Sequence, residues 1–327
     1  MAFRSEADIR EHLEFRRGMT LRRCLASFAT TLRVLQTASS LRRVARELCE
    51  DLAEDGCVYG EIRYCPSLHL EGGMTYAQAV SAVGAGLRDF HEQQQQQWQQ
   101  QRQQQPEPER PRRRPAQFRQ ILTALRDLGA SEAKKVANLA AKHKDDGSPS
   151  SDLVVGFDLA GNEQAHPPEL FVDAFEVARL AGLGLTLHAG EGSDAQSVKN
   201  VVAAVETLRV QRIGHCVAAG FSPEALRAVL RHNRSGGGRP ITIETCPTSN
   251  CHTCPAVASV AESPAVAMHR NGLRCVPCTD NALLSATRTS QEYALLLRHT
   301  DLTKEDLEAM ARFGVEEAGF ARRVAGQ

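Results

Sequence analysis

Short apolar segments alternate with longer amphipathic segments along most of this chain, and the alternation limits the folds open to it. Each short segment has the length and apolar run of a buried strand, and each longer one repeats its apolar residues at helical spacing. Strands and helices that alternate in this way form parallel sheets covered by helices. The sequence therefore predicts an α/β fold, either a closed parallel barrel or an open doubly wound sheet. Seven strands are expected, at residues 58–64, 120–125, 153–159, 184–188, 211–215, 241–245 and 273–276.

Nine helical segments complete the pattern. The helix expected after Ser222 is typical, because serine is a favoured N-cap and Pro223 fits the first helical turn, where its missing N–H costs nothing. Gly56 ends the helix that precedes the first expected strand. The predicted helices cover residues 20–35, 41–54, 75–92, 131–144, 168–181, 194–208, 222–232, 290–298 and 304–323.

Composition excludes several classes of protein. The 327 residues are 42% hydrophobic, which is enough to fill one core, so we expect a single domain over residues 1–327. Equal numbers of basic and acidic residues, 39 of each, argue against a nucleic-acid partner. No apolar run reaches membrane-spanning length, so no membrane partner is expected. The first six residues lack the apolar core of a secretory signal, which favours a cytoplasmic protein whose ten cysteines are thiols.

One segment, residues 93–114, differs from the rest of the chain in composition. It is a low-complexity stretch of glutamine, proline, glutamate and arginine that contains the only tryptophan. Such a segment buries too little apolar surface to offset its ordering entropy, so we expect a disordered insertion. The alternative is an interaction segment for an anionic partner, which the sequence does not identify. Its basic patch would consist of Arg110, Arg112, Arg113 and Arg114.

Chemically capable side chains stand where three of the expected strands end. His188 ends one strand and is followed by Glu191, His215 ends the next strand along the chain, and Asp280 follows the last strand. Parallel strands of a barrel place all their C-terminal ends on one face, where catalytic residues from several strands assemble. A single histidine at a strand end is more often a structural residue. Three such strand ends together favour a catalytic or metal-binding site.

Five motifs extend this set, and they resemble a known family when they are taken in order. The motifs are residues 158–163 (DLAGNE), 187–191 (LHAGE), 212–215 (RIGH), 246–250 (CPTSN) and 279–281 (TDN). Together they resemble the adenosine deaminase family over residues 39–319, apart from the glutamine-rich insertion. The resemblance implies a TIM-type (β/α)8 barrel of the metal-dependent hydrolase kind. It also implies one catalytic Zn²⁺ per chain and hydrolysis of the 6-amino group of adenosine-type purines, with release of ammonia.

The resemblance also assigns roles to individual residues. It makes His188 and Asp280 zinc ligands, which suits the preference of zinc for imidazole and carboxylate groups. Glu191 becomes the proton donor to purine N1, and His215 orients the attacking hydroxide. Gly161 is implied to bind substrate, because the absence of a side chain lets a ligand approach the backbone.

The chain departs from the family pattern at two places. Asn281 stands where the family often has a second aspartate that contacts the purine, and it keeps a carbonyl acceptor without the charge. More importantly, the family takes two further zinc ligands from a His-x-His at the end of its first strand, and the 327 residues contain no His-x-His. We therefore expect a barrel without its first strand, with exposed edges. His12 stands in a charged, helix-like stretch and is expected to be a surface residue.

The cysteines suggest a competing chemistry. Cys251 and Cys254, then Cys275 and Cys278, form two Cys-x-x-Cys pairs with the spacing of a four-cysteine structural zinc. The second pair lies along the strand expected at residues 273–276, where positions three apart face opposite sides of the sheet. Buried thiols are therefore the favoured interpretation.

Three functions follow from the sequence. The first is zinc-dependent deamination of adenosine or a close 6-aminopurine nucleoside, with N6-methyl-AMP or AMP as the alternative substrate. The second is a catalytically impaired relative that binds purines or a partner without turnover. The missing His-x-His is equally consistent with an N-terminally incomplete version of an active deaminase, and the sequence alone does not decide between the two. The third is a thiol–zinc interaction module that recruits partners through the glutamine-rich segment.

Overall fold

The computed structural model describes residues 3–19, 21–104, 114–235 and 239–321. Within these residues seven parallel strands form one sheet in the order of the sequence, so all seven predicted strands are confirmed. A doubly wound sheet reverses its strand order at a switch point, and this sheet does not. The strands are β1 (Tyr59–Tyr64), β2 (Gln117–Leu125), β3 (Val154–Ala160), β4 (Gly184–Ala189), β5 (Arg212–His215), β6 (Thr242–Thr245) and β7 (Arg274–Pro277).

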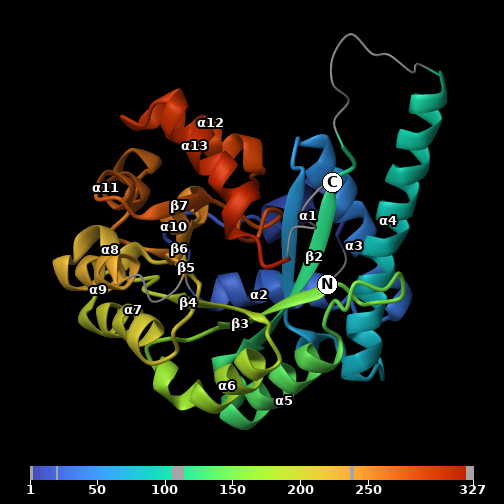
Figure 1. Cartoon of the computed structure of the whole chain (residues 1–327), viewed down its shortest axis with the longest axis horizontal. Helices are drawn as coiled ribbons and strands as arrows, with labels where there is room; N and C mark the ends of the chain where they lie inside the picture. The colour runs from blue at the N-terminus through green and yellow to red at the C-terminus, as the bar shows by residue number, and fades with distance from the viewer. Residues whose placement is uncertain (1–2, 20, 105–113, 236–238, 322–327) are drawn as a thin grey trace.

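The sheet curls into a TIM-type half-barrel with helices on its outer side (Figure 1). Neighbouring strands are in parallel register throughout, for example Thr186 beside Arg212 and Thr245 beside Pro277. In the part of the chain that the structure describes, β1 and β7 are the two edges and are not paired with each other. The barrel expected without its first strand thus has seven strands and an open seam between β1 and β7.

The helices surround the sheet as the alternation predicted, although their ends differ. The segment expected at residues 304–323 ends earlier, at Phe313, and continues as a turn of π-helix. Among the described residues, four helices lie outside the nine predicted segments. Three of them have only five to seven residues, too few to show periodicity: α8 (Val217–Phe221), α10 (Pro247–Thr253) and α11 (Pro264–Arg270). The fourth is α1 (Glu6–Leu13), in the charged, helix-like stretch that contains His12. The predicted segments correspond to α2 (Leu21–Leu32), α3 (Ala38–Glu54), α4 (Tyr76–Gln104), α5 (Gly129–Lys142), α6 (Val172–Leu180), α7 (Ala195–Glu206), α9 (Pro223–Arg234), α12 (Thr289–His299) and α13 (Lys304–Phe313).

Two groups of buried apolar side chains hold the helices on the sheet. The larger lies between β2–β7 and the outer helices, where the rings of Phe157 and Phe175 meet edge to face at 5.2 Å. The smaller lies under α3 and α4, where Phe90 meets Phe118 at 5.3 Å. Burying such a ring contributes about 1.5–3 kcal/mol. The larger group therefore fixes β4, β5 and β7, whose ends carry the candidate site, and the smaller group fixes β1 and β2.

The glutamine-rich segment is partly ordered, which corrects the expectation of disorder for its first half. Residues 93–104 continue helix α4, and the guanidinium of Arg102 lies 4.8 Å from the centre of the Trp98 ring. Glutamine is a good helix former, and extending a helix that is already packed avoids the cost of nucleation. Residues 105–113, including Arg110, Arg112 and Arg113 of the predicted basic patch, lie outside the described residues.

The N-terminal ends of the strands are covered by the C-terminal segment. The Phe320 ring lies where Cβ atoms at Gly156 and Gly184 would stand, so strands β3 and β4 accommodate it only because these residues are glycines. The Arg212 guanidinium stacks on the same ring at 3.6 Å. At the opposite end, the backbone N–H of Phe15 donates to the carbonyl of Leu284 in the loop after β7. The segments that contain Phe15 and Phe320 thus pack on opposite ends of the half-barrel.

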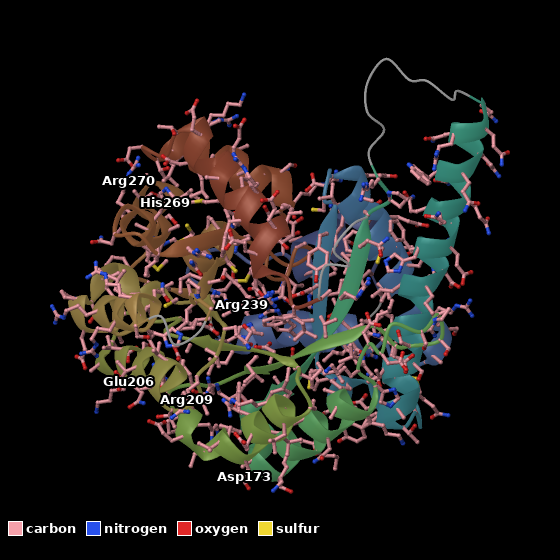
Figure 2. The ribbon with its side chains drawn as sticks, viewed as in Figure 1. Asp173, Glu206, Arg209, Arg239, His269 and Arg270 are labelled. Carbon is pink, nitrogen blue, oxygen red and sulfur yellow. The ribbon has the colours of Figure 1, made fainter. Side chains whose placement is uncertain are left out.

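Charged side chains project outward from the helix layer (Figure 2). Asp173 of α6 and Glu206 of α7 both lie on this outer rim, and Glu206 accepts a hydrogen bond from Arg231 at 3.1 Å. Among the described residues, no helix combines the length and hydropathy needed to cross a bilayer.

Candidate metal centre

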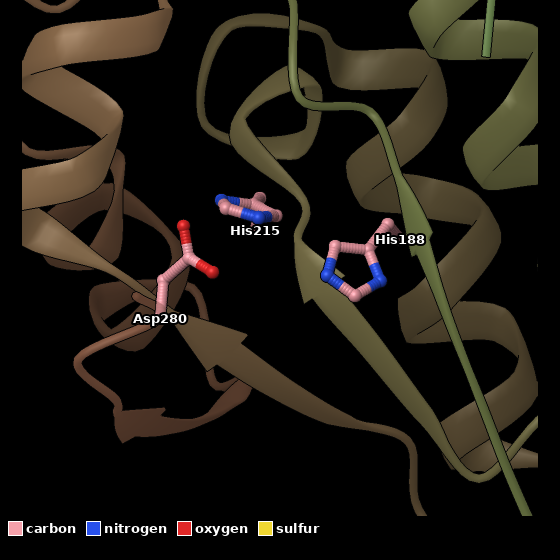
Figure 3. A group of neighbouring side chains, drawn as sticks. All are labelled: His188, His215 and Asp280. Carbon is pink, nitrogen blue, oxygen red and sulfur yellow. The ribbon is translucent and has the colours of Figure 1, made fainter. Parts of the chain in front are cut away.

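Three predicted residues from three strand ends meet at the C-terminal face of the sheet. His188 is near the end of β4, His215 ends β5, and Asp280 follows β7. One ligand atom from each lies within 4.8 Å of the others. Figure 3 shows the two imidazole rings and the carboxylate around a common space. Two nitrogens and one oxygen are the number and kind of protein ligands that a catalytic zinc takes beside water.

His188 is oriented by a buried carboxylate. Its Nδ1 lies 3.1 Å from Oδ1 of Asp158, whose side chain is 0% exposed, and this contact leaves Nε2 for the cluster. Burial lowers the pKa of His188, but the Asp158 carboxylate raises it more, to about 9. Burial also opposes ionisation of Asp158, yet His188 and Arg63 hold the pKa of that carboxyl below its usual range. The carboxylate therefore fixes the ring through a charge-assisted hydrogen bond.

His215 is held in the same way by an amide. Its Nδ1 lies 2.9 Å from Oδ1 of Asn250, an oxygen that only accepts hydrogen bonds, so Nδ1 is the donor and Nε2 is the ring nitrogen left for the cluster. The backbone of His215 has a φ of +61°, which is uncommon for a residue with a side chain. Nε2 lies 3.9 Å from Oε1 of Glu191. The ring thus faces both the cluster and the predicted proton donor.

Asp280 is fixed from two sides. Oδ2 accepts a hydrogen bond from Oγ of Ser249 at 2.7 Å, and Oδ1 accepts one from Nδ2 of Asn281 at 2.9 Å. Each carboxylate oxygen keeps a further lone pair for a metal. The structure therefore places Asn281 beside Asp280, where its amide nitrogen supports the carboxylate.

Glu191 follows a turn that is anchored by another glutamate. Both backbone N–H groups of Gly190 and Glu191 donate to Glu163 at 2.8 Å, while the Glu191 side chain stays 35% exposed. Gly190 has a φ of +69°, and a Cβ there would lie 2.5 Å from Val201. The turn is therefore rigid, and its free carboxyl points into the space beside His215.

Gly161 has a local structural reason to be glycine. Its φ is +101°, and a Cβ would overlap the carboxylate of Asp127, which also accepts a hydrogen bond from the N–H of Asn162 at 3.1 Å. The predicted contact between Gly161 and substrate stays a prediction.

His12 and the cysteines, which the sequence analysis considered as alternative ligands, are not part of the cluster. Both ring nitrogens of His12 have neighbours on α2, with Thr30 Oγ1 at 2.9 Å and Arg23 Nη1 at 3.0 Å. Cys275 donates to the carbonyl of Ala265 on the outer helix α11, and burial raises the pKa of its thiol to about 12. Cys278, which follows β7, donates to the carbonyl of Val276 in that strand, and no group of four thiols forms among the described residues.

The family is decided by comparison with known proteins. A profile of the adenosine deaminase family matches residues 4–323. The chain belongs to the adenosine deaminase family. An adenosine deaminase from Mycobacteroides abscessus is 35% identical over 293 residues, which cover 88% of this chain and 74% of that protein. As a member of this family of aminohydrolases, the chain is a hydrolase.

Two solved structures of other proteins have the same fold. The apo structure of the N6-methyl-AMP deaminase from Arabidopsis thaliana superposes with a TM-score of 0.75 at 25% identity, over 97% of this chain and 83% of that one. A zinc-bound amidohydrolase from Burkholderia ambifaria superposes with a TM-score of 0.74 at 24% identity, over 91% and 74% of the two chains.

Sequence reasoning did not assign the residues that position the cluster. Asp158, Glu163, Ser249 and Asn250 stand in the quoted motifs, but their partners lie about 27 to 35 positions away in the chain. The one available signal was that they too follow strand ends, where parallel strands bring side chains together.

Proposed function

We propose that this chain is a zinc-dependent aminohydrolase that converts adenosine, or a close 6-aminopurine nucleoside, to inosine and ammonia. The observation that carries the proposal is the meeting of His188, His215 and Asp280 within 4.8 Å in a member of the adenosine deaminase family. Two imidazoles and a carboxylate form a donor set that zinc prefers. When bound, zinc lowers the pKa of a water ligand from about 15.7 to about 7, which supplies a nucleophile at neutral pH.

Each residue of the site is then proposed to have its own role in the reaction. His188 and Asp280 hold the metal, and both are already oriented by Asp158 and Ser249. In the family pattern His215 would orient the attacking oxygen; because the 327 residues contain no His-x-His, its Nε2 is proposed to serve as the third metal ligand instead. Glu191 donates a proton to N1 of the purine, so that the ring accepts the nucleophile. Gly161 and Asn281 are proposed to line the purine subsite.

A second substrate class, N6-methyl-AMP or AMP, is favoured by the similarity to the Arabidopsis thaliana N6-methyl-AMP deaminase. The sequence is closer to the adenosine deaminase of Mycobacteroides abscessus, so adenosine remains the first choice. The two are separated by steady-state release of ammonia or methylamine from adenosine, AMP and N6-methyl-AMP. A higher kcat/KM for adenosine supports the proposal. A higher kcat/KM for N6-methyl-AMP contradicts it and makes N6-methyl-AMP the substrate.

The role of Glu191 gives a direct test of the chemistry. Glu191→Gln removes the proton but leaves the three metal-binding side chains in place, so we expect turnover to fall about 10²–10⁴-fold while bound zinc is unchanged. Full activity in Glu191→Gln would refute the assigned role. Zinc bound by wild type with no turnover of any of the three substrates would instead indicate a purine-binding relative without catalysis.

A further inference from the structure

A continuous series of charged side chains crosses the interior of the half-barrel. Arg212 of β5 bridges two carboxylates, with Nη1 at 2.6 Å from Glu61 and Nε at 2.7 Å from Glu244. Glu244 of β6 also accepts from Nη2 of Arg63 at 2.6 Å. Nη1 of Arg63 then lies 3.7 Å from Oδ2 of Asp158 on β3. The charges alternate in sign, so that each one has an opposite neighbour.

This series is buried at every position except one. The side chains of Glu61, Arg212, Glu244 and Asp158 are 5%, 8%, 8% and 0% exposed, whereas Arg63 is 28% exposed. Removing an ion from water costs several kcal/mol unless a partner compensates it. The five side chains therefore hold one another in a fixed geometry, and removing one takes a charged partner from its neighbours.

The series ends at the candidate metal centre. The two oxygens of Asp158 have different partners: Oδ1 faces Nδ1 of His188 at 3.1 Å, and Oδ2 faces Arg63 and also accepts from Oγ1 of Thr123 at 3.0 Å. The orientation of the carboxylate, and hence of the His188 ring, depends on what holds Oδ2. Thr123 supplies one neutral hydrogen bond, and among the described residues Arg63 is the one cation that joins Asp158 to the rest of the series.

We propose that Arg63 is a positioning residue for the metal centre. It orients the Asp158 carboxylate, which fixes the imidazole of His188, while Glu244 holds the guanidinium in place. Arg63 is on the edge strand β1, so the seam of the half-barrel is tied electrostatically to the ligand on β4. This inference rests on the proposed function, because it requires that His188 bind a metal.

The test measures metal binding apart from catalysis. Co²⁺ replaces Zn²⁺ in such sites, and its visible absorption reports both occupancy and coordination geometry. Wild type, Arg63→Met and Arg63→Lys are titrated with Co²⁺. We expect Arg63→Met to raise the Kd by about 10–100-fold, the usual effect of losing an outer partner of a ligand, and to change the visible band. Arg63→Lys keeps the charge and restores part of the affinity.

The matched control is Arg88→Met. Arg88 is 25% exposed and pairs at 3.3 Å with another carboxylate, Asp152, which is not in contact with the cluster. The Arg88→Met variant therefore loses a comparable ion pair. We expect its Kd for Co²⁺ and its visible spectrum to equal those of wild type. Glu244→Gln is the second variant, because it removes the carboxylate charge beside Arg63 without changing side-chain size. It should weaken Co²⁺ binding in the same direction.

The outcomes separate the two proposals. If wild type binds Co²⁺ and Arg63→Met binds it equally well with the same spectrum, the positioning role is wrong and the metal centre stands. If Arg88→Met weakens binding as much as Arg63→Met, the effect is general destabilisation and the role is also wrong. If wild type binds no Co²⁺, the proposed function fails together with this inference.

Discussion

The turn that carries Glu191 should depend on Glu163, and Glu163→Gln tests this dependence. The Glu163 carboxylate accepts from the N–H groups of Gly190 and Glu191 at 2.8 Å and from Nδ2 of Asn200 at 2.9 Å, and Oγ of Ser197 lies at 3.3 Å. Glutamine replaces one oxygen with an NH₂ group, so at least one buried donor then faces another donor.

The magnitude follows from these contacts. An unsatisfied buried donor costs about 1–3 kcal/mol, and the bonds to the remaining oxygen lose the strength that a charged acceptor gives, about 1 kcal/mol more. We therefore expect the free energy of unfolding in urea to fall by about 2–4 kcal/mol. Because the displaced turn carries the proton donor, kcat should fall at least about 10-fold, as small misplacements of reacting groups typically do, with KM nearly unchanged.

The control is Glu132→Gln, which alters a carboxylate of similar burial away from the cluster. Glu132 is 14% exposed, accepts from Ser67 at 2.7 Å and from Tyr76 at 2.5 Å, and pairs with Lys135 at 3.0 Å. It should lose stability but keep kcat. The reasoning is refuted if Glu163→Gln unfolds and turns over like wild type, or if Glu132→Gln loses as much kcat.

Three further predictions concern the scaffold. Burial and Arg119 lower the pKa of His91 to about 4 from an ordinary 6.5. The neutral ring therefore contributes about 3 kcal/mol to the free energy of unfolding above pH 6.5, and this contribution is lost as the pH falls toward 4. In urea unfolding, the stability of His91→Gln should depend less on pH over this window. Gly184→Ala should lower the Tm because its Cβ overlaps the ring of Phe320. When the same substitution is made in the Phe320→Ala variant, the loss of Tm should be smaller. Cys254→Ser should leave bound zinc unchanged, since the thiols are not the proposed ligands; loss of zinc would favour the thiol–zinc alternative.

Much of the fold was predictable because its signals are local. A buried parallel strand is a short apolar run, and all seven runs are strands in the structure. Helix ends were less predictable. The glutamine-rich continuation of α4 depends on the packed residues before it, and composition alone does not contain that information. The short helix α10 places Ser249 and Asn250 beside Asp280 and His215, yet seven residues are too few to show helical periodicity.

The three residues of the candidate metal centre were predictable from the sequence, but the residues that orient them were not. His188, His215 and Asp280 stand at strand ends, and the parallel topology brings strand ends together. The partner of each ligand depends on side-chain direction and register, which the sequence pattern does not specify. Asp158 illustrates this limit, because its two oxygens contact Arg63 and His188 from different strands.

The central claim is that His188, His215 and Asp280 hold one catalytic zinc. The most direct measurement is the zinc content of the purified 327-residue chain together with ammonia release from adenosine, for wild type and His188→Ala. The account predicts one zinc per chain and ammonia release in wild type, and loss of both in His188→Ala, because two remaining ligands bind zinc poorly. Wild-type protein without zinc and without turnover, or zinc retained in full by His188→Ala, would contradict it.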